Sequence, residues 1–324
     1  MVQEVFIQII EILKSSNSIY IENCDLRSKT WIHRGGTCHI YSEPVSIDVL
    51  VRVAKICASH NLNYHVVGHT SNLYFHNDYN PDVVISTKKI DSWNVDGNVL
   101  HCECGAPIKK VSRFCIEHGL GGFEGFIQLP GTVGGAIVNN SGCFGSRISE
   151  ILVSCSFLQQ DGTVVKLSNE DLHYTHRNSI LKSKELKGVI LSADFRLNIS
   201  NSKELSIKAE KIIEKRNSTQ EGPAHNLGST YAVAEYKSFV RVLFGIIDRL
   251  CSVLNAKNNI LYRKKTLLFI TCNHKLDNYI SDRNIACFIW RDQKADAAFL
   301  EYNRFMKRVC KECKLEIEEH SNNI

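Results

Sequence analysis

Apolar residues recur along this chain with helical spacing in some segments and as short runs in others, which predicts a mixed α+β fold. Near the start, Val5, Ile9 and Leu13 lie on one stripe of an amphipathic surface helix. Similar stripes predict helices after Ser46, an N-cap residue, and after Pro107, at a first helical position. Strands are predicted at residues 64–67, 83–86, 99–104, 151–158, 163–167 and 189–197.

The balance of elements changes in the second half of the chain, which indicates two domains. Asp161 and Gly162 form a hairpin turn between two of the predicted strands. Beyond residue 231 glycine nearly disappears, helices dominate, and the last strong helix is predicted at residues 295–313. We therefore place a domain boundary near residue 200. The predicted parts are an N-terminal helix at residues 1–20, a first domain at residues 21–200 and a second domain at residues 201–324.

Composition and charge narrow the range of functions. The net charge of +5 is modest and spread along the chain, which suits an anionic cofactor or a nucleotide-sugar rather than nucleic acid. No segment resembles a signal peptide or a membrane span, so we expect a cytoplasmic protein without a membrane partner. The 13 cysteines are expected to be reduced. Because the pair Cys310 and Cys313 has no second pair of ligands nearby, we expect no metal site.

Glycine is concentrated in residues 119–145, which hold nine glycines in 27 positions. Within this segment, residues 130–136 read Pro-Gly-Thr-Val-Gly-Gly-Ala. Backbone N–H groups in such a stretch can converge on an anion without interference from Cβ atoms. The spacing fits neither a Walker loop nor the GxGxxG fingerprint. On these grounds alone, a phosphate-binding loop and a glycine-rich structural turn are both open.

The same residues, 130–136, resemble the pyrophosphate segment of the UDP-N-acetylenolpyruvoylglucosamine reductases (MurB), which belong to the FAD-binding superfamily of vanillyl-alcohol oxidase. Other motifs of that family occur here in the same order. They are residues 30–36, 68–73, 140–145, 176–180, 220–230 and 315–318. The resemblance covers residues 26–230, and more loosely residues 284–318. It implies a two-part FAD-binding PCMH-type domain followed by a smaller α/β substrate-binding domain.

The resemblance also implies a cofactor and partners. FAD would be bound without a covalent link, NADPH would reduce it, and the substrate would be a nucleotide-sugar. The protein would be a monomer or a weak oligomer. The residues implied in FAD binding are Gly68, His69, Thr70, Ser71, Asn72, Pro130, Gly131, Thr132, Gly134, Gly135, Ala136, Asn140 and Gly142.

Three residues at the family's catalytic positions suit the reduction of an enolpyruvyl ether. Hydride addition to this group builds negative charge next to a carboxylate, and cationic or acidic groups must stabilise it. By resemblance, Arg177 would hold the carboxylate with its planar fork. Glu318 would stabilise the developing enolate, in a protonated form favoured by burial. Ser229 would deliver the proton as a general acid.

The chain also departs from the family pattern. His69 and Thr70 stand where the family has glycines, and residues 231–234 read Tyr-Ala-Val-Ala in place of a Phe-Lys-Asn-Pro run. Residues 232–283 cannot be matched to the family. Another nucleotide-sugar is therefore open as the substrate. Because Gly-His-Thr is similar to the Gly-His-Ser of oxidases that attach FAD through histidine, a sugar or lactone oxidase is the alternative enzyme. A non-enzymatic flavin-binding protein is the third reading, and the three retained catalytic residues count against it.

Overall fold

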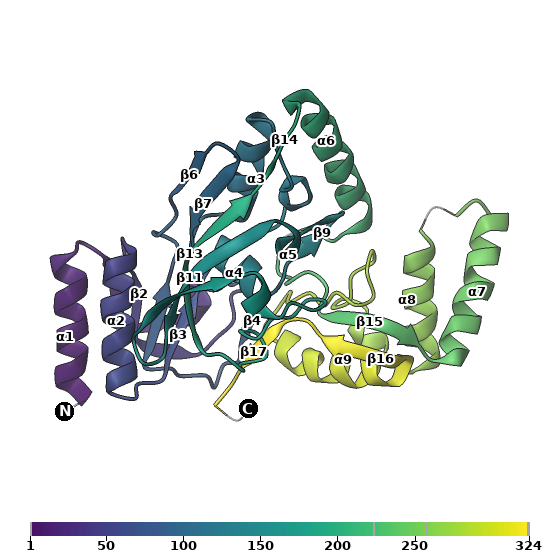
Figure 1. The fold of residues 1–324 in the computed structure, drawn as a ribbon. Coiled ribbons are helices and arrows are strands. Elements are labelled where there is room, and N and C mark those ends of the chain that lie inside the picture. The colour runs from purple at the N-terminus through teal and green to yellow at the C-terminus, as the bar shows by residue number, and fades with distance from the viewer. Residues whose placement is uncertain (1, 223, 257, 323–324) are drawn as a thin grey trace. The chain divides into compact units, whose positions relative to one another are not determined.

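The computed structural model describes residues 2–222, 224–256 and 258–322, and the chain divides into two compact units. The first unit comprises residues 1–26, 36–70 and 77–214. The second unit comprises residues 27–35, 71–76 and 215–324. Figure 1 shows the order of helices and strands along the chain.

The two compact units divide the chain at other residues than the domain boundaries predicted from the sequence. The chain passes from the first unit to the second at residues 214–215, not near residue 200. Two short early segments belong to the second unit, and helix α1 (Val2–Ser15) belongs to the first unit instead of forming a part of its own. Hydrophobic spacing cannot detect such an exchange of segments, because it reports only local structure. Residue 1 and residues 323–324 of the predicted parts lie outside the described residues.

One sheet of the first unit has four strands in the order β1-β2-β5-β3. Its strands are β1 (Ile19–Asp25), β2 (Thr37–Glu43), β5 (Val83–Ser86) and β3 (Tyr64–Val67). β1 and β2 are antiparallel, and the other two pairs are parallel. Helices α1 and α2 (Ile47–Ser59) pack against each other beside this sheet, as Figure 1 shows. The predicted stripe of α1 is buried, and the Ser46 hydroxyl caps α2 by accepting a hydrogen bond from the N–H of Val49.

The other large sheet of the first unit has five antiparallel strands in the order β12-β11-β13-β7-β6. These strands are β12 (Val164–Ser168), β11 (Leu152–Gln159), β13 (Gly188–Arg196), β7 (Val99–Glu103) and β6 (Trp93–Asp96). The predicted hairpin joins β11 to β12, and Gly162 there has a left-handed φ of 86°, which explains the glycine. The helices of this region are α3 (Ile108–Glu117), α4 (Val133–Val138), α5 (Ile148–Ile151) and α6 (Ser202–Thr219).

Short elements complete the first unit. The paired ones are β8 (Leu120–Gly121) with β14 (Asn198–Ile199), and β9 (Gly142–Cys143) with β10 (Ser146–Arg147). Short 3-10 helices along the described chain are η1 (Leu26–Ser28), η2 (Glu124–Phe126), η3 (Glu170–Leu172) and η4 (His274–Leu276).

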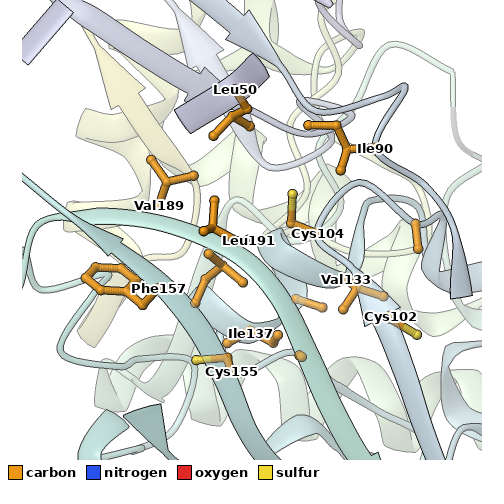
Figure 2. Packing of buried hydrophobic residues seen from close by; sticks show 14 of the residues in the cluster. Leu50, Ile90, Cys102, Cys104, Val133, Ile137, Cys155, Phe157, Val189 and Leu191 are labelled. Carbon is orange, nitrogen blue, oxygen red and sulfur yellow. The ribbon is translucent and has the colours of Figure 1, made fainter. Parts of the chain in front are cut away.

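The core of the first unit brings both sheets and helix α4 together. Figure 2 shows Val133 and Ile137 of α4 near Leu191 of β13, with Phe157 and Cys155 from β11. Several cysteines act here as small apolar residues. Burial raises the pKa of the Cys155 thiol to about 12, so this side chain stays protonated and unreactive. All 13 cysteines are free, in agreement with the prediction that they are reduced.

The second unit combines two small β-pairs with three helices. Strand β4 (Leu73–Phe75) runs parallel to β17 (Glu318–His320), and β15 (Tyr231–Tyr236) runs antiparallel to β16 (Cys310–Leu315). The helices are α7 (Ser238–Val253), α8 (Asn259–Ile270) and α9 (Ala295–Val309). Its core is rich in aromatic rings. They are Tyr74, Phe288, Trp290, Phe299 and Tyr302.

The last helix is shorter than predicted. It ends at Val309, and residues 310–315 form strand β16 instead of the final turn of the helix. The sequence of this segment, Cys-Lys-Glu-Cys-Lys-Leu, has no strong preference for either structure. Pairing with β15, which lies far away in the sequence, decides in favour of the strand.

We expect the aromatic cluster to carry much of the stability of the second unit. Phe299 is 1% exposed and lies 5.1–5.3 Å from the rings of Phe288, Trp290 and Tyr74. Phe299→Ala should lower the free energy of unfolding by about 3–5 kcal/mol, measured by urea titration with tryptophan fluorescence. Phe269, which is 70% exposed, is the matched control. Phe269→Ala should change the free energy of unfolding by less than about 0.5 kcal/mol. Equal losses in the two variants would contradict this account of the core.

Candidate functional site

The two loops predicted to hold the cofactor phosphates touch each other within the first unit. A Cβ atom at Gly68 would lie 2.4 Å from Thr132 Oγ1, so only glycine fits there. Thr132 is buried and caps α4, because its hydroxyl accepts a hydrogen bond from the N–H of Gly135 at 3.3 Å. The threonine therefore cannot move aside without losing that bond. Thr70 follows in a left-handed conformation with φ 57°.

Gly134 and Gly135 face different surroundings. The N–H of Gly134 donates to the carbonyl of Cys104 at 2.8 Å, and a Cβ on Gly134 would lie 3.1 Å from that oxygen. A Cβ on Gly135 would meet only Thr132 Oγ1, at 3.5 Å, so this position is open. Glycine within a helix costs about 1 kcal/mol relative to alanine. Gly135 is exposed, and among the described residues no close contact requires glycine at this position.

His69 lies in an electropositive neighbourhood of the first unit. Burial lowers the pKa of His69, and the positive charges of Lys88, Lys109 and Lys110 lower it further. Asp91 opposes them more weakly. The imidazole is therefore neutral at pH 7. Three lysines beside a loop that contacts Thr132 suit a ligand with negative charge, such as a pyrophosphate.

Arg177 lies in a tight turn of the first unit. Thr175 and Asn178 exchange two backbone hydrogen bonds of 3.1 and 3.2 Å, with His176 and Arg177 between them. Arg177 has a left-handed φ of 56°, which is unfavourable for a residue with a Cβ atom. Backbone strain of this kind is concentrated at functional sites, where the surrounding structure holds it.

Hydrogen bonds from either side hold the Arg177 turn against the end of α4. The Asn140 side chain donates to the carbonyl of Thr175 at 2.9 Å and accepts from the N–H of Ser149 at 3.2 Å. The Ser179 hydroxyl donates to the carbonyl of Val138 at 2.6 Å. Asn140, which we predicted to contact the cofactor, therefore uses both ends of its side chain within the protein.

A pocket of about 220 Å³ opens beside this turn. Arg177 and His176 line it, together with Arg147, Glu150 and Gly142. Glu150 Oε1 lies 4.0 Å from Arg147 Nη1, so the Glu150 carboxylate balances part of the positive charge of the two arginines. Gly142, another predicted cofactor contact, belongs to the ribbon of β9 and β10. The pocket offers an arginine to an anionic group.

Ser229 and Glu318 both follow the same end of the β15–β16 ribbon in the second unit. Strands β15 and β16 are antiparallel, and their pairing continues beyond Tyr231, because the N–H of Glu316 donates to the carbonyl of Thr230 at 2.9 Å. Ser229 precedes this bond on one strand and Glu318 follows it on the other. The register therefore places the two predicted catalytic residues at the same end of one ribbon. Arg177 belongs to the first unit.

The predicted cofactor loop continues into the second unit, where it binds the strand of Glu318. Ser71 and Asn72 belong to this unit. The N–H of Glu318 donates to the carbonyl of Asn72 at 2.9 Å, and the Asn72 amide donates to the carbonyl of Glu316 at 3.2 Å. Glu318 then pairs in parallel with Leu73. A loop residue and a candidate catalytic residue are thus fixed to each other by backbone geometry.

Two neighbouring glutamates in β17 differ in their surroundings. Side chains alternate along a strand, so Glu318 and Glu319 point to opposite faces. Burial raises the pKa of Glu319, and its Oε1 has no hydrogen-bond partner among the described residues. Burial therefore favours the protonated form of Glu319.

Glycine and asparagine shape the backbone before Ser229. Gly228 has a left-handed φ of 76°, and its N–H donates to the Asn226 side chain at 2.9 Å. Asn226 is buried and donates through its amide to the carbonyl of Ala224 at 3.1 Å. This network presents Ser229 as an exposed residue after a fixed turn.

The candidate site includes residues that were predicted from the sequence and others that were not. Pro130, Gly131 and Ala136 lie in the loop and first turns around α4, and the carbonyl of Gly131 accepts a hydrogen bond from the N–H of Ile108. The lysines near His69 were missed, although Lys109 and Lys110 stand together after Pro107. Asn284, which contacts Ser229, was also missed, and no motif marks it.

The structure adds two observations on metals and membranes. Among the described residues, no three histidine, cysteine, aspartate or glutamate side chains cluster as metal ligands would. Every helix within the described ranges is too short or too polar to span a bilayer.

Comparison with known proteins gives a consistent picture. The family described as FAD binding domain matches residues 39–168. UDP-N-acetylenolpyruvoylglucosamine reductase of Caldicellulosiruptor bescii is 31% identical over 221 residues, which cover 68% of this chain and 70% of that protein. The enzyme of the same name from Clostridium novyi is 28% identical over 230 residues, covering 69% and 74%. The crystal structure of the MurB reductase from Thermus caldophilus has the same fold, with a TM-score of 0.64 at 17% identity, covering 93% of this chain and 98% of that chain.

We predict that the two glycines of α4 respond differently to substitution. Gly135→Val should abolish FAD retention while the melting temperature of the apo-protein stays nearly unchanged, because the new side chain enters open space. Gly134→Val should lower that melting temperature, because its branched Cβ collides with Cys104. Bound FAD is measured by absorbance after gel filtration. If Gly135→Val remains yellow, the cofactor does not approach this backbone.

The pKa of His69 predicts how acid affects the first unit. Its pKa is lower in the folded than in the unfolded chain, where it is about 6.5. The stability from neutral His69 is present above pH 6.5 and is lost as the pH falls towards the folded pKa. His69→Asn cannot take up a proton, so its melting temperature should fall less than that of the wild type between pH 7 and pH 5. Parallel melting curves for the two apo-proteins would contradict this prediction.

Proposed function

The chain belongs to the UDP-N-acetylenolpyruvoylglucosamine reductase (MurB) family, and we propose that it reduces the enolpyruvyl group of UDP-N-acetylglucosamine enolpyruvate to form UDP-N-acetylmuramate. One observation carries this proposal most strongly. The β15–β16 register brings Ser229 and Glu318 to one end of a ribbon, although the two residues are far apart in sequence. The reduction of an enolpyruvyl ether requires both a proton donor and an acidic group.

The first unit suits FAD. The open backbone at Gly135, the close contact of Gly68 with Thr132, and the lysines around His69 fit a dianionic pyrophosphate. When bound, FAD would serve as the hydride carrier between NADPH and the substrate. The residues proposed to contact it are those implied by the resemblance, except that Asn140 uses its side chain to hold the Arg177 turn.

Each proposed catalytic residue has a distinct task. The Arg177 guanidinium, carried on its strained turn, holds the substrate carboxylate and stabilises the negative charge that builds up beside it. Glu318 stabilises the enolate oxygen. Ser229 transfers its hydroxyl proton to the substrate carbon next to the carboxylate, and water restores that proton. NADPH and one proton are consumed for each molecule reduced, and the electrons balance.

The substrate domain differs from the family pattern, and this bears on substrate identity. Residues 232–283 form the end of β15, helices α7 and α8 and the segments that follow them. None of the three proposed catalytic residues comes from this segment. We therefore propose that this chain keeps the reaction of the family. The contacts with the sugar of the substrate are the part that differs. Because the proposed reaction uses a nucleotide-sugar and NADPH, we propose that the enzyme acts in the cytoplasm, as a monomer or a weak oligomer.

We also propose that FAD is bound without a covalent link. The oxidase alternative rests on the sequence Gly-His-Thr at residues 68–70, and the neutral form of His69 could act as a nucleophile. Three nearby lysines instead point to phosphate binding, because their charges have no role at the dimethylbenzene ring of the flavin. Ser229 and Glu318 also suit a reductase, which must protonate its product, better than an oxidase, which must remove a proton.

Half-reaction kinetics provide the main test of the proposed function. Ser229→Ala should leave the anaerobic reduction of the flavin by NADPH unchanged and slow its reoxidation by the enolpyruvyl substrate by about 10²–10⁴-fold. Stopped-flow absorbance of the flavin separates the two steps. An equal loss in both steps would assign Ser229 to the fold or the cofactor site. If the wild type does not turn over the substrate, the proposed function is wrong.

Acid precipitation tests the mode of FAD attachment. The expected result is a colourless protein pellet and a yellow supernatant, because a noncovalent cofactor leaves the unfolded chain. A yellow pellet, with the mass of FAD on the peptide that contains His69, would establish the covalent link and favour the oxidase. Steady production of hydrogen peroxide with a free sugar should then follow.

A further inference from the structure

The hydroxyl of Ser229 has a specific partner in the second unit. The side-chain amide of Asn284 donates a hydrogen bond to Ser229 Oγ at 2.9 Å. The amide orientation is fixed by its other end, because Asn284 Oδ1 accepts a hydrogen bond from the N–H of Ala286 at 3.0 Å. A backbone N–H can only donate, so the oxygen must face Ala286 and the NH₂ group must face Ser229.

We propose that Asn284 is a positioning residue that aims the Ser229 proton at the substrate. A serine hydroxyl has one proton and two lone pairs. Because Asn284 can only donate at this contact, it occupies a lone pair and keeps the hydroxyl proton from pointing towards it. The donated hydrogen bond also stabilises the oxygen as the proton leaves. This inference rests on the proposed function, in which Ser229 is the general acid.

The turn that carries Asn284 is fixed by its own contacts. The hydroxyl of Ser281, a fully buried residue, accepts hydrogen bonds from the N–H groups of Arg283 at 3.0 Å and Asn284 at 3.2 Å. It donates to Glu221 at 2.6 Å. The buried ammonium of Lys264 donates to the carbonyl of Ile280 at 2.9 Å. A side chain on such a braced turn keeps its direction, as a positioning role requires.

The opposite side of Ser229 is also fixed. The N–H of Thr230 donates to the carbonyl of Ala286 at 2.7 Å, and the hydroxyl of Thr230 accepts from the N–H of Phe288 at 3.1 Å. Asn284 and Ser229 are therefore on two segments that are already joined by other bonds. Ser229 is exposed and Asn284 is half-buried, so their own hydrogen bond adds little to stability. Its removal should affect chemistry more than folding.

The test measures flavin reoxidation by the enolpyruvyl substrate in the FAD-bound enzyme. Asn284→Ala should lower the rate constant at saturating substrate about tenfold, the size expected for one lost hydrogen bond. Substrate affinity, flavin reduction by NADPH and melting temperature should stay unchanged. Asn284→Asp keeps the shape but loses the donor at neutral pH, so it should be at least as slow. Asn273→Ala is the matched control, because the Asn273 amide donates to the carbonyl of Thr271, away from Ser229, and its rate should match the wild type.

A double-mutant cycle separates positioning from other roles. In the Ser229→Ala background, Asn284→Ala should cause no further loss, because the group that it positions is gone. An unchanged rate for Asn284→Ala and Asn284→Asp alone would overturn the inference, and so would a full tenfold loss in the Ser229→Ala background. If Ser229→Ala alone leaves reoxidation unchanged, the proposed role of Ser229 fails together with the inference. The inference alone fails when Ser229→Ala is slow and Asn284→Ala is not.

Discussion

The pairing of β15 with β16 is the constraint on which the candidate chemistry of the second unit depends. A shift of one residue would move every side chain of the ribbon to the other face. The step from the ribbon to Ser229 on one strand and to Glu318 on the other would then change. The register is held by the hydrogen bond between Glu316 and Thr230, and by the burial of Tyr231 at 7% exposure. The backbone of the second unit therefore fixes the chain positions of the proposed proton donor and the proposed acid relative to each other.

In the first unit, close packing and charge perform the corresponding task for the cofactor. Gly68 and Thr132 approach so closely that neither loop can shift independently. The lysines that lower the pKa of His69 destabilise any positive charge there, which is a cost in the apo-protein that a bound pyrophosphate would offset. The Arg177 turn is also held by its surroundings. Its left-handed backbone is tolerated because the Asn140 side chain hydrogen-bonds the carbonyl of Thr175 at the start of the turn.

The sequence predicted local features well and long-range features poorly. Stripes such as that of α1, the cap at Ser46 and the hairpin at Gly162 follow from residue spacing and turn chemistry, and they agree with the structure. Residues 310–315 were assigned to a helix because strand pairing with a distant segment leaves no local signal. The parallel pairing of β4 with β17 was invisible for the same reason. Motifs located the candidate catalytic residues, but only the fold reveals Asn284.

Asn284 reaches Ser229 from a part of the chain that lies far outside the serine motif. The residues of β15 follow soon after Ser229. Their side chains belong to the β15–β16 ribbon, and the apolar ones pack in the core of the second unit. The Ser229 hydroxyl accepts its hydrogen bond from Asn284, in a turn more than fifty residues later in the sequence. Lys264 of α8 holds this turn by donating to the carbonyl of Ile280. A buried lysine is costly unless oxygens surround its charge, and this ammonium donates to the carbonyls of Asp277 and Ile280 and to the carboxylate of Asp282. The turn proposed to orient Ser229 thus offsets the cost of burying Lys264. Helix α8, in the divergent segment, is therefore connected through this turn to the proposed proton donor.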